Sequence, residues 1–174
     1  MKTLVTLAAT SLLLVAGTAW AQSPSDAQIA AIVVTANQVD IDAGKLAESK
    51  GSSGDVKAFA KQMITDHSGV NKQAVALVTK LKVTPEDNAT TKSLKAGGAD
   101  NVKSLEKLSG AAFDRAYIDH EVVYHDQVLD AIDKTLIPSA QNAELKALLV
   151  AVRPAFVAHR DHARSIQAEL AKKS

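Results

Sequence analysis

The sequence contains no cysteine. This absence excludes disulfide bonds, thiolate metal ligands and thiol-based catalysis together. The fold therefore has to be stabilised by side-chain packing, and any metal ion has to be held by histidine and carboxylate ligands. With 174 residues, the chain is long enough for one domain with its own hydrophobic core.

Other absences narrow the function classes. The 20 Lys and Arg nearly balance the 19 Asp and Glu, and no basic patch carries interleaved aromatic residues, so nucleic acid is not an expected partner. The motifs G-x-S-x-G, H-E-x-x-H and the P-loop are missing. His120-Glu121 begins the second of these, but Tyr124 stands where its second histidine would be. The sequence thus favours a protein without enzymatic activity over a hydrolase.

The N-terminal segment MKTLVTLAATSLLLVAGTAWAQ has the three parts of a secretory signal peptide. Lys2 precedes an apolar run, and Ala19-Trp20-Ala21 supplies the cleavage pattern. We expect residues 1–21 to be the signal peptide, residues 22–174 to form the domain, and the protein to be exported or periplasmic. An uncleaved anchor is the alternative, although the run is shorter than the roughly 20 residues that a membrane span needs. No later segment is long and apolar enough to span a membrane.

Apolar residues recur at three-and-four spacing, and no strand with an alternating pattern is found, so we predict an all-α fold. Ser25 and Gln28 form the S-x-x-Q pattern of a helix N-terminus. Four long helices are expected to begin near Ser25, after Gly54, after Gly110 and near Asn142, and to end before Gly51, before Val83, near Leu136 and near Ala171.

The connections between these helices are short, long and short. The long one, from Pro85 to Gly110, is expected to be broken at Gly97-Gly98 and to hold a short helix at about 101–108. Such a connection can carry the chain along a bundle, as in ferritin-like folds. We therefore predict a ferritin-like four-helix bundle with a short extra helix. Pro154 should kink the last helix or leave a carbonyl unpaired.

Each predicted helix carries an ionisable residue inside its apolar stripe, where an unpaired charge would be costly. The residues of the first three helices fall at similar heights in the bundle, and His159 on the last helix falls about one or two turns away, so we predict that they converge. The expected metal ligands are Asp40, His67, Glu121, His125 and His159, with Asp66 and Asp114 supporting them. His120 and His162 fall at the stripe margins.

Three imidazoles with carboxylates suit iron, zinc, manganese or copper(II). Carboxylate-bridged di-iron bundles use Glu-x-x-His on two helices. Here Glu121 and His125 are four residues apart, and no glutamate precedes His67 at that spacing. A mononuclear site or a proton-responsive network is easier to build. The alternative is a purely structural polar layer in a non-enzymatic envelope stress, ligand-binding or partner-binding bundle; the sequence leaves partner and oligomeric state open.

The order of several motifs resembles domain-of-unknown-function family 4142. The motifs are Asp40-x-Asp42-x-Gly44-Lys45-Leu46-Ala47, Met63-x-x-Asp66-His67 and Ser109-Gly110-Ala111-Ala112-Phe113-Asp114-Arg115-Ala116-Tyr117. The resemblance implies a ferritin-like bundle in the periplasm or at the envelope, in a family often labelled as outer-membrane proteins, and it supplies no established activity. His67, His125 and His159 occupy the family's histidine positions. Asp40 stands where the family more often has glutamate.

Overall fold

The computed structural model describes residues 23–172, and within this range it contains helices and no strand. The long helices are α1 (Asp26–Lys50), α2 (Gly54–Leu81), α3 (Ala89–Leu105), α4 (Gly110–Ala131) and α6 (Ala143–Lys172). A π-helical turn, η1 (Ile132–Leu136), and a short helix, α5 (Ile137–Ser139), follow α4. The predicted all-α fold is confirmed, and so is the capping box of Ser25 and Gln28 that starts α1.

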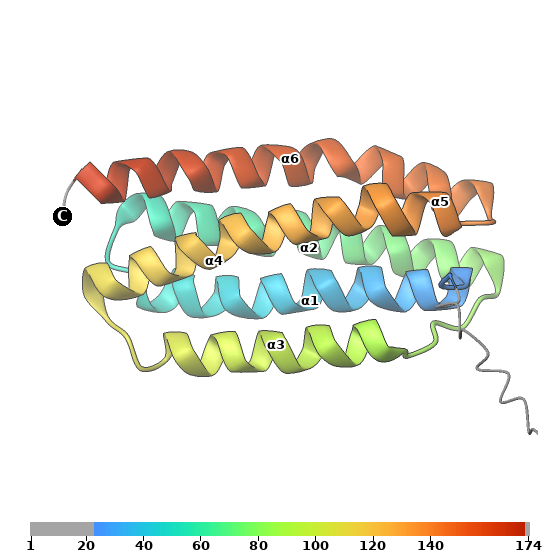
Figure 1. Cartoon of the computed structure of the whole chain (residues 1–174), viewed down its shortest axis with the longest axis horizontal. Helices are drawn as coiled ribbons and strands as arrows, with labels where there is room; N and C mark the ends of the chain where they lie inside the picture. Colours follow the sequence, from blue (N-terminus) through green and yellow to red (C-terminus); the bar gives the residue numbers. More distant parts are fainter. Residues whose placement is uncertain (1–22, 173–174) are drawn as a thin grey trace, which may run out of the picture.

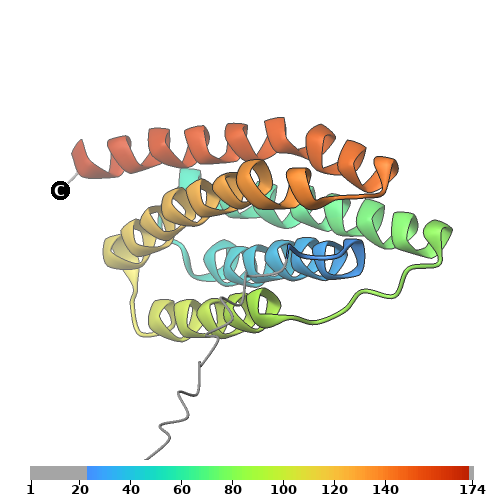
Figure 2. The ribbon, with the colours of Figure 1, turned by 45° about the vertical axis from the view of Figure 1, so that its right-hand side comes forward.

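The four-helix bundle consists of two antiparallel pairs, α1 with α2 and α4 with α6 (Figure 1). Helix α3 lies outside the bundle against α1 and runs in the same direction as α1 (Figures 1 and 2). Helix α3 returns the chain to the end of the bundle at which α2 begins (Figure 1). Helix α4 starts at this same end, so α2 and α4 run parallel. This is the long-crossover topology that the connection lengths predicted.

The extra helix is longer than predicted, and the expected break at Gly97-Gly98 is wrong. Helix α3 begins at Ala89, behind an Asn88 cap, and passes through both glycines. A Cβ atom at Gly98 would lie 2.7 Å from Cγ1 of Val39 on α1. Gly98 therefore permits close contact between two helices instead of interrupting one.

The end of α4 also differs from the prediction. The α-helix stops at Ala131, and the helical path continues through η1 and α5 to Ser139, beyond the end that was expected near Leu136. Pro138 stands in the first turn of α5, directly after the π-helical turn. Helix α6 continues through Pro154, which lies on its exposed face.

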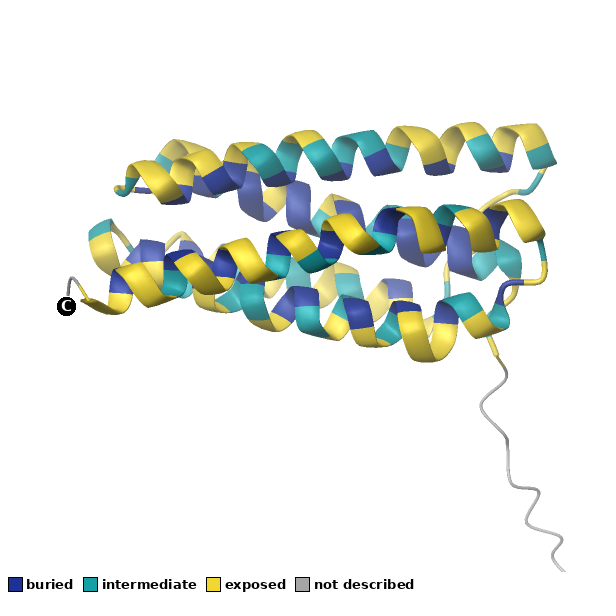
Figure 3. Cartoon of the chain, turned by 90° about the horizontal axis from the view of Figure 1, so that it is seen from above, coloured by how far each residue is buried: buried dark blue, intermediate teal, exposed yellow. Residues whose placement is uncertain are grey.

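The core is divided into two apolar clusters along the length of the bundle, and the buried residues follow the inner faces of the helices (Figure 3). One cluster contains Ile29, Val33 and Leu129, and the other contains Ala43 and Phe59. Burial of each large side chain contributes about 1.5–3 kcal/mol. Along every helix of the four-helix bundle, a buried ionisable residue falls between members of the two clusters, so a polar layer crosses the bundle between them.

The expected signal peptide, residues 1–21, lies outside the described residues. Within residues 23–172, none of the helices combines the length and the hydrophobicity that a membrane crossing requires. Exposed residues recur along the length of α2, α3, α4 and α6 (Figure 3).

Candidate metal centre

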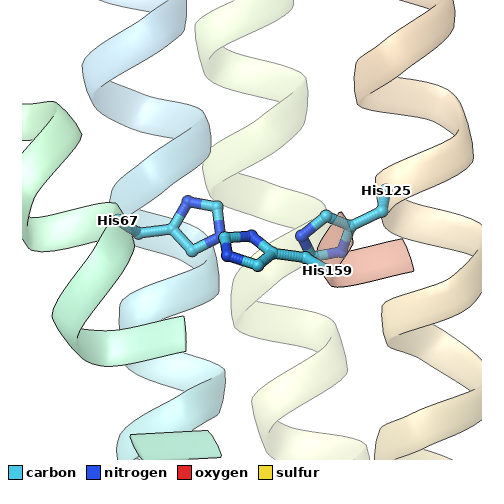
Figure 4. Close-up of side chains that lie close together, drawn as sticks. All are labelled: His67, His125 and His159. Carbon is cyan, nitrogen blue, oxygen red and sulfur yellow. The ribbon is translucent and has the colours of Figure 1, made fainter. Parts of the chain in front are cut away.

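Four helices bring the five predicted ligands into one layer. Asp40 lies on α1, His67 on α2, Glu121 and His125 on α4, and His159 on α6, and each is at most 2% exposed. One possible ligand atom from each of the three histidines lies within 4.8 Å of the others, and the same holds for Asp40, Glu121 and His125. Figure 4 shows the three imidazole rings meeting from α2, α4 and α6.

The carboxylate of Asp40 lies between two of these rings. Its Oδ2 atom is 3.0 Å from Nε2 of His67 and 3.6 Å from Nε2 of His125. Two ligand atoms bound to one zinc-like ion at about 2.0–2.1 Å in a tetrahedron are about 3.3 Å apart. The spacing around Asp40 is therefore close to that of atoms that share a coordination sphere.

The outer nitrogen of each ring is held by an oxygen atom. Nδ1 of His67 donates to Oδ1 of Asn37 at 2.6 Å, because the Asn37 amide group donates to the Val33 carbonyl. Nδ1 of His125 lies 3.0 Å from the carbonyl oxygen of Glu121. Nε2 of His159 lies 2.9 Å from Oδ2 of Asp66. These oxygens only accept hydrogen bonds, so each ring keeps its proton on the outer nitrogen.

Apart from their contacts with one another, the inward-facing atoms have no hydrogen-bond partners within the described residues. They are both carboxylate oxygens of Asp40, Oε2 of Glu121, Nε2 of His67, Nε2 of His125 and Nδ1 of His159. Buried polar atoms in proteins are normally paired, and leaving one unpaired costs about 1–3 kcal/mol. The residues present thus fit a cation that accepts lone pairs from several of these atoms.

Burial and mutual proximity set the charges of the layer. Burial acts to raise the pKa of Asp40, but the charge and hydrogen bond of His67, with smaller contributions from the other two histidines, hold the pKa below its ordinary value. Burial, with the Asp40 charge, raises the pKa of Glu121 well above its ordinary value. Burial lowers the pKa of His125 to about 4 and also lowers that of His159. Near neutral pH, these two imidazoles are therefore in the neutral form that binds metal ions.

Two residues expected to support the ligands have different roles. Asp66 contacts His159 directly, as described above. Asp114 is buried, but its carboxylate accepts hydrogen bonds from the backbone N–H groups of Ser52 (2.9 Å) and Ser53 (2.8 Å) in the loop between α1 and α2. Asp114 therefore holds this loop against α4.

Sequence reasoning missed Asn37, which is 2% exposed and orients His67. The available signal was its position three residues before Asp40, on the same face of the helix. The aromatic surroundings were also missed: the Phe156 ring centroid lies 5.1 Å from that of His67. His120 is half-buried and stacks on Tyr124, and His162 is exposed, so neither joins the layer.

Comparison with known proteins yields one match. A family model described as "Domain of unknown function (DUF4142)" matches residues 14–166. No curated protein and no solved structure matches the chain. The matched range includes all five residues of the histidine layer, which we define as Asp40, His67, Glu121, His125 and His159. The description of the family specifies neither a ligand nor an activity.

Proposed function

The chain belongs to the DUF4142 family, and we propose that it binds a divalent first-row transition-metal ion inside its helical bundle. One observation carries this proposal. Three imidazoles have their outer nitrogens bonded to oxygen, while their inner nitrogens and the Asp40 carboxylate converge on one another and have no other hydrogen-bond partner. Histidines that bind metal ions almost always donate their other ring N–H to a carboxylate, a carbonyl or water.

The types of donor atom limit which metal ions can bind at this site. Three nitrogen atoms and one carboxylate suit iron, manganese, zinc or copper, whereas calcium and magnesium prefer ligand sets made of oxygen. The two groups of potential ligands share His125, so one ion bound by His67, His125, His159 and Asp40 is the simplest arrangement. Glu121 would join as a further ligand after losing its proton. Because no Glu-x-x-His motif is present, the chain lacks the bridging carboxylates of a di-iron centre.

We further propose that the protein acts outside the cytoplasm, in the periplasm or at the envelope, after cleavage behind Ala21. The composition of residues 1–21 supports export. The absence of cysteine is consistent with a metal site that does not depend on the redox state of thiols.

Metal analysis of protein purified without an affinity tag tests the proposal. We expect about one equivalent of a transition metal per chain, and a thermal stabilisation of the metal-free protein when the ion is returned, since a ligand at 100 times its Kd adds about 2.7 kcal/mol. The double variant His67→Ala/His125→Ala should lose both effects. His162→Ala, which removes an exposed histidine, should retain them. Absence of bound metal, together with no thermal shift with iron, zinc, manganese or copper, would refute the proposal.

The second candidate is a bundle that binds an apolar ligand or an envelope partner, with a histidine layer that only stabilises the fold. A groove of about 960 Å³ between α1, α2 and α3 favours this candidate. Val34, Val39 and Val75 contribute to its wall, and Val75 is 52% exposed. In this case the double variant His67→Ala/His125→Ala would be less stable than the wild type by the same amount with and without added metal ions.

A further inference from the structure

A smaller apolar cavity, of about 110 Å³, lies between α1, α4 and α6. Its side walls are almost entirely aliphatic. The lining spans from Leu149 to Phe156 on α6, which corresponds to about 10 Å along the helix axis. The aliphatic residues that carry the argument are Ile32 and Val33 on α1, Ile132 and Leu136 in η1, and Leu149 and Val152 on α6.

The inner end of this cavity reaches the residues that surround the histidine layer. Asn37, Tyr124 and Phe156 all contribute to its lining. The amide oxygen of Asn37 accepts the hydrogen bond from His67, and the Phe156 ring lies 5.1 Å from His67 and 6.1 Å from His125, measured between ring centroids. The Tyr124 hydroxyl donates to the carbonyl of Ala36 at 2.9 Å, so it is already satisfied. One layer of side chains therefore separates the cavity from the imidazoles.

The opposite side of the cavity includes exposed residues. Thr90 on α3 and Gln127 on α4 both belong to the lining and are exposed, and Leu94 beside them is partly buried. The cavity thus reaches the surface where α3 faces α4. This opening provides an entry path that does not require the bundle to unfold.

An irregular segment of backbone forms part of the wall. The π-helical turn η1 interrupts the helical path between α4 and α5, and two of its residues, Ile132 and Leu136, line the cavity. Single π-helical turns are rare and frequently occur at functional sites. Within residues 23–172 no other π-helical turn occurs, so the departure from regular geometry coincides with the cavity.

We propose that this cavity binds a small apolar molecule, of benzene size or smaller, and holds it beside the histidine layer. A cavity of about 150 Å³ lined by Leu, Ile and Phe takes up benzene or xenon. The cavity here is somewhat smaller, and its side walls are aliphatic in the same way. Binding requires only the apolar walls. Presentation of the bound molecule to a metal ion rests on the proposed function, because the ion would lie on the far side of Phe156 and Asn37.

Benzene titration of metal-free protein, followed by methyl NMR, tests the proposal. We expect saturable shifts of the methyl signals of Val33, Ile132 and Leu149, with intermolecular contacts between these methyl groups and benzene. The substitution Ala131→Phe adds a ring to a wall residue and should weaken benzene binding by about tenfold or more. Ala147→Phe, at an exposed position of α6, should leave binding unchanged.

A second variant covers the case in which Ala131→Phe does not fold. Leu149→Ala enlarges the cavity and should allow ethylbenzene to bind, with shifts of the methyl signals of Val33 and Ile132. The proposal is overturned if benzene produces no saturable shift at these methyl groups, or if a folded Ala131→Phe binds as well as the wild type.

The result is separate from the test of metal binding. Benzene binding without metal binding would refute the metal site and leave the cavity proposal intact. Metal binding without benzene binding would refute the cavity proposal and leave the metal site intact. If both are observed, benzene should change the visible spectrum of the Co²⁺-loaded protein, because an apolar molecule beside Phe156 alters the surroundings of His67 and His125.

Discussion

Asp66 offers the sharpest test of the candidate metal centre, because it touches a proposed ligand but lies at the surface. Its side chain is 41% exposed, whereas that of His159 is 3% exposed, and Oδ2 lies 2.9 Å from Nε2 of His159. In Asp66→Asn, the amide oxygen can still accept this hydrogen bond, but the negative charge that makes the imidazole more basic is lost. In Asp66→Ala, both the charge and the acceptor are lost.

The expected magnitude follows from the role of such partners in metal sites. Removing an oxygen that orients a metal-binding histidine costs about 10–100-fold in metal affinity, which corresponds to about 1.4–2.7 kcal/mol. We expect Asp66→Asn to lower the metal affinity by about tenfold and Asp66→Ala to lower it by about 100-fold. The free energy of unfolding of the metal-free protein should fall by less than about 1 kcal/mol in either variant, since the side chain is partly exposed.

Competition titration of Co²⁺ or Zn²⁺ against a chromophoric chelator measures these affinities. Asp126→Asn is a matched control: it also removes a half-exposed acid of the bundle that contacts α6, here through Arg160 and Arg164. Its metal affinity should equal that of the wild type. If Asp126→Asn and Asp66→Ala weaken binding equally, the effect is one of general charge, and the assigned role of Asp66 is wrong.

The remaining predictions concern stability, each measured by urea unfolding of metal-free protein. Since the pKa of Glu121 is raised above its ordinary value of 4.5, the folded state holds this proton more tightly than the unfolded chain, and Glu121 destabilises the fold increasingly as pH rises above that value. Glu121→Gln should thus match the wild type at pH 4 and exceed its stability at pH 8; equal stability at both would contradict the assignment. Gly98→Ala should lower the free energy of unfolding by about 1–3 kcal/mol, because the new methyl group meets Val39. Gly97→Ala, which has open space around it, should raise the free energy of unfolding by about 0.5–1 kcal/mol. If Gly98→Ala stabilises the protein, the close-contact interpretation is refuted. Asp114→Ala should cost about 1–3 kcal/mol by leaving the loop N–H groups unpaired, and no loss would show that water replaces the carboxylate.

The helical periodicity was sufficient to predict which polar residues face inward, because the direction of a side chain depends only on its position along its own helix. Asp40, His67 and His125 were therefore selected without knowledge of their neighbours. The position of each residue along the bundle axis was harder to predict. Asp114 shares a face with Glu121 but lies seven residues earlier, which is about 10 Å along the axis and places it at the loop after α1.

The errors arose where distant segments decide the local structure. Gly97-Gly98 read as a break because glycine is a poor helix former, but Gly98 is explained by contact with Val39, which comes 59 positions earlier in the chain. Asn37 was overlooked because an asparagine inside a helix is unremarkable until the ring that it orients, on α2, is known. The π-helical turn of η1 likewise had no local sequence signal that we recognised.

The division of the core into two apolar clusters has a consequence for the register of the helices. A slip of α2 or α6 by one turn, about 5.4 Å, would carry His67 or His159 into a wholly apolar cluster and separate its outer nitrogen from the acceptor on the neighbouring helix. Apolar side chains alone would tolerate such a slip, because one aliphatic residue replaces another at little cost. The polar layer therefore selects one axial alignment of the four helices among several that would bury similar apolar area.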